Sequence, residues 1–161
     1  MSAQRVLIVD DDPALLQALP QTLRLRMSEV IVDTVDSALG ALERISEREY
    51  DAVVSDIKMP GMDGLRLLAE ILARRPDTPT LMITGHGEYD LALQCLRGGA
   101  YDFIQKPIDR DQFLSSLHRA IEAHALNRRV REHTLALERC LRELELIVAR
   151  LGREPRSSGA P

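Results

Sequence analysis

Short apolar segments alternate with longer amphipathic ones along most of the chain. The short segments have the length of β-strands and are mostly rich in β-branched or aromatic residues. They lie at Arg5–Val9, Val30–Val35, Asp51–Ser55, Thr80–Thr84 and Tyr101–Gln105. Between them, hydrophobic residues recur at helical spacing in Pro13–Arg26, Ser37–Glu49, Leu65–Arg75 and Tyr89–Arg97. Strand–helix units with right-handed crossovers predict a doubly wound α/β fold, with helices on both faces of a five-stranded parallel sheet.

The first predicted helix has a clear start and one internal conflict. Asp12 is a residue type that caps helices, and proline is favoured at the position that follows, Pro13. Pro20 lies inside the same pattern, lacks an amide hydrogen and should kink or shorten the helix. We therefore expect a helix that begins at Pro13 and is disturbed near Pro20.

A fifth helix begins near Asp109 and has no stop signal at the expected edge of the globular part. Neither proline nor glycine occurs from Asp111 to Leu151, so an extended C-terminal helix is predicted. The last residues are rich in glycine, proline and serine, which is typical of disorder. We divide the chain into a globular domain at 1–124, a coiled-coil helix at 125–152 and a disordered tail at 153–161.

Two sets of residues recur every seven positions in this helix. They are Ala123, Val130, Leu137, Leu144 and Leu151, and, three residues before members of that set, Asn127, Thr134, Leu141 and Val148. This pattern predicts a parallel coiled coil, and hence a homodimer through the C-terminal helix. Cys140 and Ile147 widen the stripe and allow a second register. Packing of the helix on its own globular domain is the alternative.

Bulk properties restrict the class of protein further. The chain has 161 residues, a formal net charge of -4 and no strongly basic block, so direct DNA binding is not indicated. Its start lacks the features of a signal peptide, and no apolar run is long enough to span a membrane. Cys95 and Cys140 lack metal-ligand spacing, and we expect free thiols in a reducing cytoplasm.

Polar and charged residues stand at the ends of four predicted strands. Asp10 and Asp11 follow the first strand, Asp56 the third, Thr84 ends the fourth and Lys106 follows the fifth. Ligands of parallel α/β sheets bind beyond the carboxyl ends of the strands, where the strand order reverses. The sequence therefore predicts a site that combines carboxylates, a hydroxyl and one ammonium group.

These residue types suit phosphoryl chemistry. Closely packed carboxylates repel one another unless a proton or a cation joins them, and Mg²⁺ prefers such oxygen ligands. A lysine such as Lys106 can pair with a phosphoryl oxygen, and the hydroxyl of Thr84 can donate to another. An aspartate carboxylate can itself attack phosphorus and form an aspartyl phosphate.

The segments LIVDDDP, VVSDIKMPGMDG, LMITGHG and YDFIQKP, in this order and spacing, closely resemble the receiver domains of response regulators in two-component signalling. The resemblance covers roughly residues 4–124. It implies the flavodoxin-like strand order 2-1-3-4-5. It also implies that Asp56 is the phosphorylated residue and that Asp10, Asp11 and Asp56 hold Mg²⁺, together with the backbone carbonyl of Lys58.

The same resemblance assigns roles to residues beyond the metal site. Thr84 and Lys106 match the switch hydroxyl and the phosphate-pairing lysine, which act in catalysis with Asp56. Phe103 falls at the position of a rotating aromatic residue that takes part in the switch. The Lys106-Pro107 bond is often cis in the family. Lys58 and His86 occupy two variable positions that tune the lifetime of the phosphate.

The function that follows is a phosphoprotein that accepts a phosphoryl group from a sensor histidine kinase or a phosphotransfer protein. It would switch conformation to control a dimer partner or an output domain, without membrane contact. We expect no enzyme activity on an external substrate, only catalysis of its own aspartyl phosphorylation and dephosphorylation. The C-terminal helix is similar to signalling helices that precede HD-GYP or kinase output domains.

Several alternatives stay open at this point. Thr84 could be an ordinary β-branched strand residue and Phe103 ordinary packing. His118, His124 and His133 are best explained as solvated helix residues. The segment LIVDDDPAL also fits the D-x-D pattern of haloacid-dehalogenase-like phosphatases, although that function would leave Asp56 unexplained.

Overall fold

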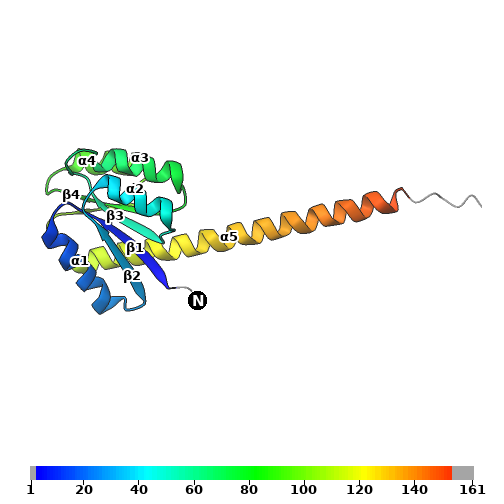
Figure 1. The fold of residues 1–161 in the computed structure, drawn as a ribbon, viewed down its shortest axis with the longest axis horizontal. Coiled ribbons are helices and arrows are strands. Elements are labelled where there is room, and N and C mark those ends of the chain that lie inside the picture. The colour runs from blue at the N-terminus through cyan, green and yellow to red at the C-terminus, as the bar shows by residue number, and fades with distance from the viewer. Residues whose placement is uncertain (1–2, 154–161) are drawn as a thin grey trace, which may run out of the picture. The chain divides into compact units, whose positions relative to one another are not determined.

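The computed structural model describes residues 3–153 and contains a single five-stranded parallel sheet (Figure 1). Its strands are β1 (Gln4–Val9), β2 (Val30–Val35), β3 (Ala52–Asp56), β4 (Thr80–Thr84) and β5 (Asp102–Gln105). They are ordered β2-β1-β3-β4-β5, and every neighbouring pair is parallel. The predicted fold class and strand order are confirmed.

Five helices connect and flank the strands. They are α1 (Pro13–Arg26), α2 (Ala38–Glu47), α3 (Gly64–Arg74), α4 (Tyr89–Arg97) and α5 (Arg110–Leu151). Figure 1 shows α1 and the first turns of α5 on one face of the sheet, and α2, α3 and α4 on the other. The long C-terminal helix predicted from the absence of glycine and proline is therefore present.

Alternation along the strands builds a core on each side of the sheet. In β1, Val6 and Ile8 join a cluster with α1 and α5, whereas Leu7 and Val9 join a cluster with α2 and α3. All four side chains are fully buried. Because successive side chains of a strand point to opposite faces, one apolar strand serves both cores.

Helix α1 confirms its predicted cap but not the predicted disturbance. The Asp12 side chain accepts a hydrogen bond from the amide of Ala14, and Pro13 occupies the first turn. The helix continues through Pro20 to Arg26 and is not shortened. Pro20 is buried between neighbours that pack into the core, so burial offsets the hydrogen bond that proline cannot make.

The chain divides into two compact units, Met1–Ala125 and Leu126–Pro161, and α5 contributes to both. In the first unit, Phe113, Leu117 and Ile121 of α5 are buried. In the second, every described residue is exposed. Most of the tail predicted at 153–161 lies outside the described residues, and the coiled coil stays a prediction.

The three helix histidines do not share one environment. His118 and His133 are exposed, as expected. His124 is not solvated: its side chain is 14% exposed, its Nδ1 lies 2.9 Å from the backbone oxygen of Asp77, and its Nε2 lies 3.9 Å from the Asp51 carboxylate. This contact ties the last turn of α5 within the first unit to the amino-terminal end of the sheet. Between residues 3 and 153, no helix combines the length and apolar character required to cross a membrane.

Candidate functional site

The predicted site residues meet at the carboxyl edge of the sheet because the strands end at the same level. Val9 pairs in register with Ser55, Asp56 with Ile83, and Thr84 with Gln105. The amide of Lys106 donates to the carbonyl oxygen of Thr84 at 2.8 Å, which continues this alignment one residue beyond β5.

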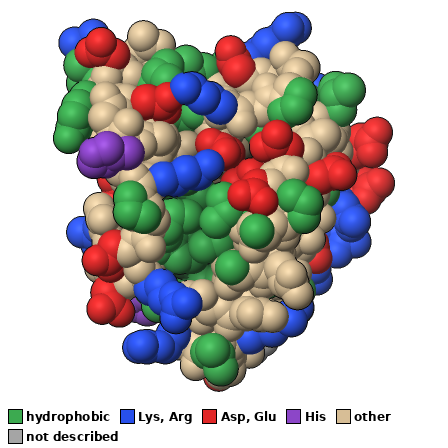
Figure 2. Space-filling model, turned by 90° about the vertical axis from the view of Figure 1, so that its left-hand side faces the viewer, with side chains coloured by type: hydrophobic (Ala, Val, Ile, Leu, Met, Phe, Trp, Pro, Cys, Tyr) green, Lys and Arg blue, Asp and Glu red, His purple; other side chains and the backbone are tan. Residues whose placement is uncertain are grey.

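Three carboxylates form the centre of the site. Asp10, Asp11 and Asp56 each offer an oxygen within 4.8 Å of the others. Asp10 is fully buried and Asp56 is 5% exposed, whereas Asp11 is exposed. Figure 2, which faces this end of the first unit, shows acidic side chains gathered beside basic ones. The clustering that a shared cation requires is therefore present in the fold.

Asp10 has the most strongly perturbed carboxylate of the cluster. Burial raises its pKa to about 6, and the negative charges of Asp56 and Asp11 act in the same direction. A hydrogen bond of 2.9 Å from the amide of Asp12 to Oδ1 opposes this shift. The other oxygen, Oδ2, is buried and has no hydrogen-bond partner among the described residues. The charge of Lys106 also lowers the pKa of Asp10 but does not cancel the effect of burial, and a bound cation would favour the charged form further.

The carboxylate oxygens of this site are chemically suited to bind Mg²⁺. The ion prefers hard oxygen ligands and uses one or two carboxylates with water to complete an octahedral shell. The oxygens of Asp10, Asp11 and Asp56 could supply such ligands, and a bound ion would give the buried Oδ2 of Asp10 a partner. The role predicted for the backbone carbonyl of Lys58 stays a prediction.

Lys106 provides the positive charge of the site. Its ammonium lies 2.9 Å from Oδ2 of Asp56. Burial lowers the pKa of Lys106, but the hydrogen bond and charge of Asp56 outweigh this effect, and the pKa is raised above its usual value. The lysine is therefore charged at neutral pH. The Lys106-Pro107 bond is cis, as the resemblance implies.

The two predicted switch residues differ in burial. Thr84 is fully buried, and its hydroxyl oxygen has no hydrogen-bond partner among the described residues. Phe103 lies in β5 and is half-buried. Thr80 of the same strand also has a buried hydroxyl without a partner, so this feature alone does not set Thr84 apart, and its switch role stays a prediction. The switching role of Phe103 stays a prediction.

Glycine allows the start of α3 to approach the end of β3 closely. A Cβ atom added to Gly64 would lie 2.5 Å from the backbone oxygen of Asp56 and 2.5 Å from Cα of Ile57. The amide of Gly64 also donates to the carbonyl oxygen of Ile57 at 2.7 Å. Any larger residue would displace the backbone of Asp56.

Sequence reasoning missed one residue of the site, Glu88. Its carboxylate forms an ion pair with the ammonium of Lys58 and accepts a hydrogen bond of 2.9 Å from the amide of Gly85. The Lys58 hydrogen bond and the Gly85 amide hold the pKa of Glu88 below its usual value. The amide of Lys58 donates to Oδ1 of Asp56 at 3.4 Å. His86, in the same loop, is exposed.

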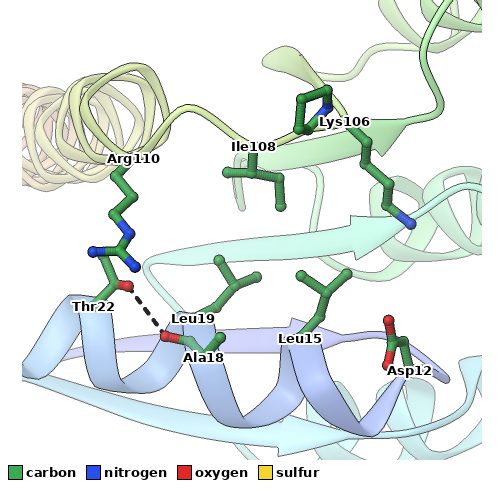
Figure 3. Close-up of a pocket in the computed structure, with 9 residues that line it drawn as sticks. Asp12, Leu15, Ala18, Leu19, Thr22, Lys106, Ile108 and Arg110 are labelled. Carbon is green, nitrogen blue, oxygen red and sulfur yellow. Dashed lines mark hydrogen bonds between the residues drawn. The ribbon is translucent and has the colours of Figure 1, made fainter.

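A groove of about 380 Å³ opens beside the site, between α1 and the segment that joins β5 to α5. Figure 3 shows Leu15, Leu19 and Ile108 along its apolar walls, with Lys106 and Asp12 at one end and Arg110 at the other. Lys106 belongs to both the groove and the carboxylate site. A molecule bound in the groove would therefore lie next to Asp56.

Comparison with known proteins agrees with this geometry. Residues 6–118 match the response regulator receiver domain family. The C4-dicarboxylate transport transcriptional regulatory protein DctD of Pseudomonas aeruginosa is 46% identical over 134 residues, covering 83% of this chain and 28% of that protein. The response regulator protein FleR of the same species is 38% identical over 154 residues, covering 94% of this chain and 31% of that protein.

Solved structures support the same assignment. The signal receiver domain of an HD domain-containing protein from Pseudomonas fluorescens Pf-5 has a TM-score of 0.74 and 30% identity, covering 80% of this chain and 94% of that one. NtrX from Brucella abortus also has a TM-score of 0.74, with 36% identity, and the match covers 81% of this chain and 29% of that one. This chain thus spans less than a third of the length of the curated relatives that it matches. From Val6 to His118, the sequence, fold and site geometry agree, and the chain belongs to the response regulator receiver domain family.

Proposed function

We propose that this chain is a phosphorylation-controlled response regulator in which Asp56 accepts a phosphoryl group. The observation that carries the proposal is the environment of Asp56, whose carboxylate lies between two other carboxylates and the ammonium of Lys106. A nearly buried nucleophile with a charged lysine at 2.9 Å is suited to a transfer that adds negative charge.

In the proposed transfer, a carboxylate oxygen of Asp56 attacks the phosphorus of a phosphohistidine. The bond between phosphorus and the imidazole nitrogen breaks, and its electron pair stays on that nitrogen. The product is an aspartyl phosphate, and Lys106 can pair with one of its oxygens. Mg²⁺ held by Asp10, Asp11 and Asp56 would supply the positive charge that offsets the remaining charge on the transferred group.

Positioning by the fold accounts for the rest of the proposed catalysis. The close contact at Gly64 holds the backbone of Asp56, and the hydrogen bond to Lys106 holds its carboxylate. The phosphoryl group stays on the chain until water removes it. We therefore propose no external substrate, only the chain's own phosphorylation and dephosphorylation.

The proposed response to phosphorylation begins at Thr84. Its unsatisfied hydroxyl can donate to a phosphoryl oxygen, which would stabilise a second position of the loop after β4. The side chain of Phe103 would then change its position, and with it the surface formed by α4, β5 and α5. The phosphoryl group carries about 1.5 to 2 negative charges in place of the single charge of the free carboxylate, and this change can shift a two-state equilibrium.

The proposed partners follow from two surfaces. The groove beside Lys106 would receive a sensor histidine kinase or a phosphotransfer protein, because a phosphohistidine presented there approaches Asp56. The exposed hydrophobic stripe of residues 126–151 would form a homodimer as a coiled coil. We place both events in the cytoplasm, where free Cys95 and Cys140 stay reduced.

The proposed output is control of transcription. DctD is named as a transcriptional regulatory protein, and it is more similar to this chain than the receiver of the HD domain-containing protein is. These names favour a transcriptional role over a phosphodiesterase role for the dimer partner or output domain. Contact with DNA is not assigned to residues 3–153.

Acetyl phosphate tests the acceptor. The full chain is incubated with acetyl phosphate and Mg²⁺, and the mass of the intact protein is measured. We expect one phosphoryl adduct, which is absent in Asp56→Asn and retained in Asp90→Asn, a matched exposed residue of α4. A haloacid-dehalogenase-like phosphatase would instead keep the adduct in Asp56→Asn and lose it in Asp10→Asn.

A further inference from the structure

Two loops at the mouth of the site are joined by an ion pair. Lys58 lies in the loop between β3 and α3, and Glu88 lies in the loop between β4 and α4. The Lys58 side chain is 70% exposed, whereas that of Glu88 is 22% exposed. The two paired residues are 30 positions apart in sequence. No role for this side-chain pair was predicted from the sequence.

Glu88 also holds the residue that follows the switch threonine. Its second carboxylate oxygen accepts the amide hydrogen of Gly85 at 2.9 Å, and its own amide donates to the carbonyl oxygen of Gly85 at 3.2 Å. A Cβ atom on Gly85 would lie 2.8 Å from this carboxylate, so glycine allows the approach. Although Glu88 is at the N-cap position of α4, its side chain makes no capping hydrogen bond.

Lys58 connects this arrangement to the acceptor. Its amide donates to Oδ1 of Asp56 at 3.4 Å, while its ammonium is bound to Glu88. In this arrangement the hydroxyl of Thr84, next to Gly85, makes no hydrogen bond with any described residue. The backbone of Lys58 therefore lies beside the acceptor, while its flexible side chain contacts Glu88 in the neighbouring loop.

We infer that the Lys58–Glu88 ion pair is a latch that holds the β4–α4 loop in its unphosphorylated position. The inference rests on the proposed role of Asp56. A phosphoryl group on Asp56 carries more negative charge than the Glu88 carboxylate and competes for the Lys58 ammonium. Once Lys58 turns to the phosphoryl group, the β4–α4 loop that carries Glu88 and Gly85 is no longer held to the β3–α3 loop, and Thr84 can move to donate to the same group.

The weakness of exposed ion pairs suits this role. Such pairs contribute little to stability because water screens them and ordering two long side chains is unfavourable. A charged acceptor that appears nearby can therefore take one partner without a large barrier. Lys58 and Glu88 act in this scheme as positioning residues, because they set the loop through which Thr84 reaches the phosphoryl group.

Beryllium fluoride, a mimic of the phosphoryl group, provides the test. The full chain is titrated with it in the presence of Mg²⁺, and the amide resonances of Thr84 and Gly85 are followed by NMR. Glu88→Gln removes the ion pair but keeps an oxygen that can accept from Gly85. We expect this variant to bind beryllium fluoride about two- to fivefold more tightly than the wild type. Its free spectrum should shift toward the bound one.

Two controls separate the latch from a general effect of charge. Asp90→Asn removes one exposed acidic charge from the first turn of α4 and should leave the affinity unchanged. In a Lys58→Gln background, Glu88→Gln should no longer raise the affinity. An equal gain in both backgrounds, or no gain in the wild-type background, would overturn the latch. If the wild type binds no beryllium fluoride, the acceptor assignment itself fails, and the latch fails with it.

Discussion

The two parts of helix α5 use the same kind of sequence in opposite ways. Between Arg110 and Ala125, its hydrophobic face is buried: Phe113 and Leu117 are 0% exposed and Ile121 is 1% exposed. From Leu126 to Leu151, the large hydrophobic side chains are between 52% and 67% exposed. Both parts belong to one continuous helix, which contains neither glycine nor proline.

The difference shows what amphipathic periodicity can and cannot predict. A repeated hydrophobic stripe predicts that a helix buries one face, but not whether the partner surface belongs to the same chain. The first part finds its partner in the sheet. The second part buries nothing within residues 3–153, although helices in proteins gain most of their stability from packing of an amphipathic face. This contrast supports the proposed dimer.

Truncation of a core side chain gives the largest expected difference between the two parts. Phe113→Ala should lower the free energy of unfolding of the first unit by about 3–5 kcal/mol, because it leaves a cavity in a fully buried cluster. Leu137→Ala should change it by less than about 0.5 kcal/mol. Urea unfolding followed through the NMR signals of the sheet measures both. Equal losses would contradict the division into two units.

Disruption of the proposed dimer should come next in size. Leu144→Asp places a charge at a core position in both possible registers and should weaken self-association about 100-fold, or roughly 3 kcal/mol. Leu146→Asp is the matched control, because Leu146 is 64% exposed against 57% for Leu144 but lies outside both registers. Sedimentation equilibrium distinguishes them. A chain that stays dimeric with Asp at 144 would exclude the coiled coil.

Removal of the buried charge at Asp10 should have a smaller effect and the opposite sign. Burial raises the pKa of Asp10 to about 6 in the folded state, so the folded protein binds its proton more tightly than the unfolded chain. The stability from this group is present at low pH and lost as pH rises through about 6. Without divalent ions at pH 7.5, Asp10→Asn should therefore raise the free energy of unfolding by about 2 kcal/mol.

The control for Asp10 is its exposed neighbour. Asp11→Asn removes a charge that water already solvates and should change the unfolding free energy by less than about 0.5 kcal/mol. Added Mg²⁺ should stabilise the wild type and leave Asp10→Asn nearly unaffected. A destabilised Asp10→Asn protein in the absence of metal would show that the carboxylate has a structural partner instead.

The smallest effect is expected on the surface of the second unit. Glu138 pairs with Arg142 one turn later at 3.9 Å, and both side chains are exposed. Glu138→Gln should lower the free energy of unfolding of the helix by less than about 0.5 kcal/mol. Circular dichroism of the full chain measures this change. A loss as large as that of Leu141→Ala would mean that polar pairs, rather than the hydrophobic stripe, hold this region.

Most of the fold could be predicted because burial on both faces leaves a strong pattern. The strands β2 and β4 have the predicted bounds, and the other three differ by one residue at one or both ends. Pro20 was the exception. Its local penalty is real, but its side chain is buried beside Leu19 and near Leu23, and this tertiary contribution cannot be seen in the periodicity.

The site could be predicted as far as it depends on strand ends. Asp10, Asp56 and Lys106 meet because parallel strands end at one edge, a consequence of topology alone. Glu88 and His124 could not be found in this way. Their contacts join loops and a helix end that are distant in sequence, and neither residue belongs to a periodic pattern.

The unsatisfied oxygens of Asp10 and Thr84 have a consequence for how this protein can change. Each leaves a buried polar atom without a hydrogen bond among residues 3–153, which costs a folded chain about 1–3 kcal/mol. On the proposed function, replacing either residue with a well-packed apolar one would stabilise the fold and abolish the response to phosphorylation. Selection for heat resistance alone should therefore enrich substitutions at these two positions. The selected proteins would keep the fold but would no longer respond to phosphorylation.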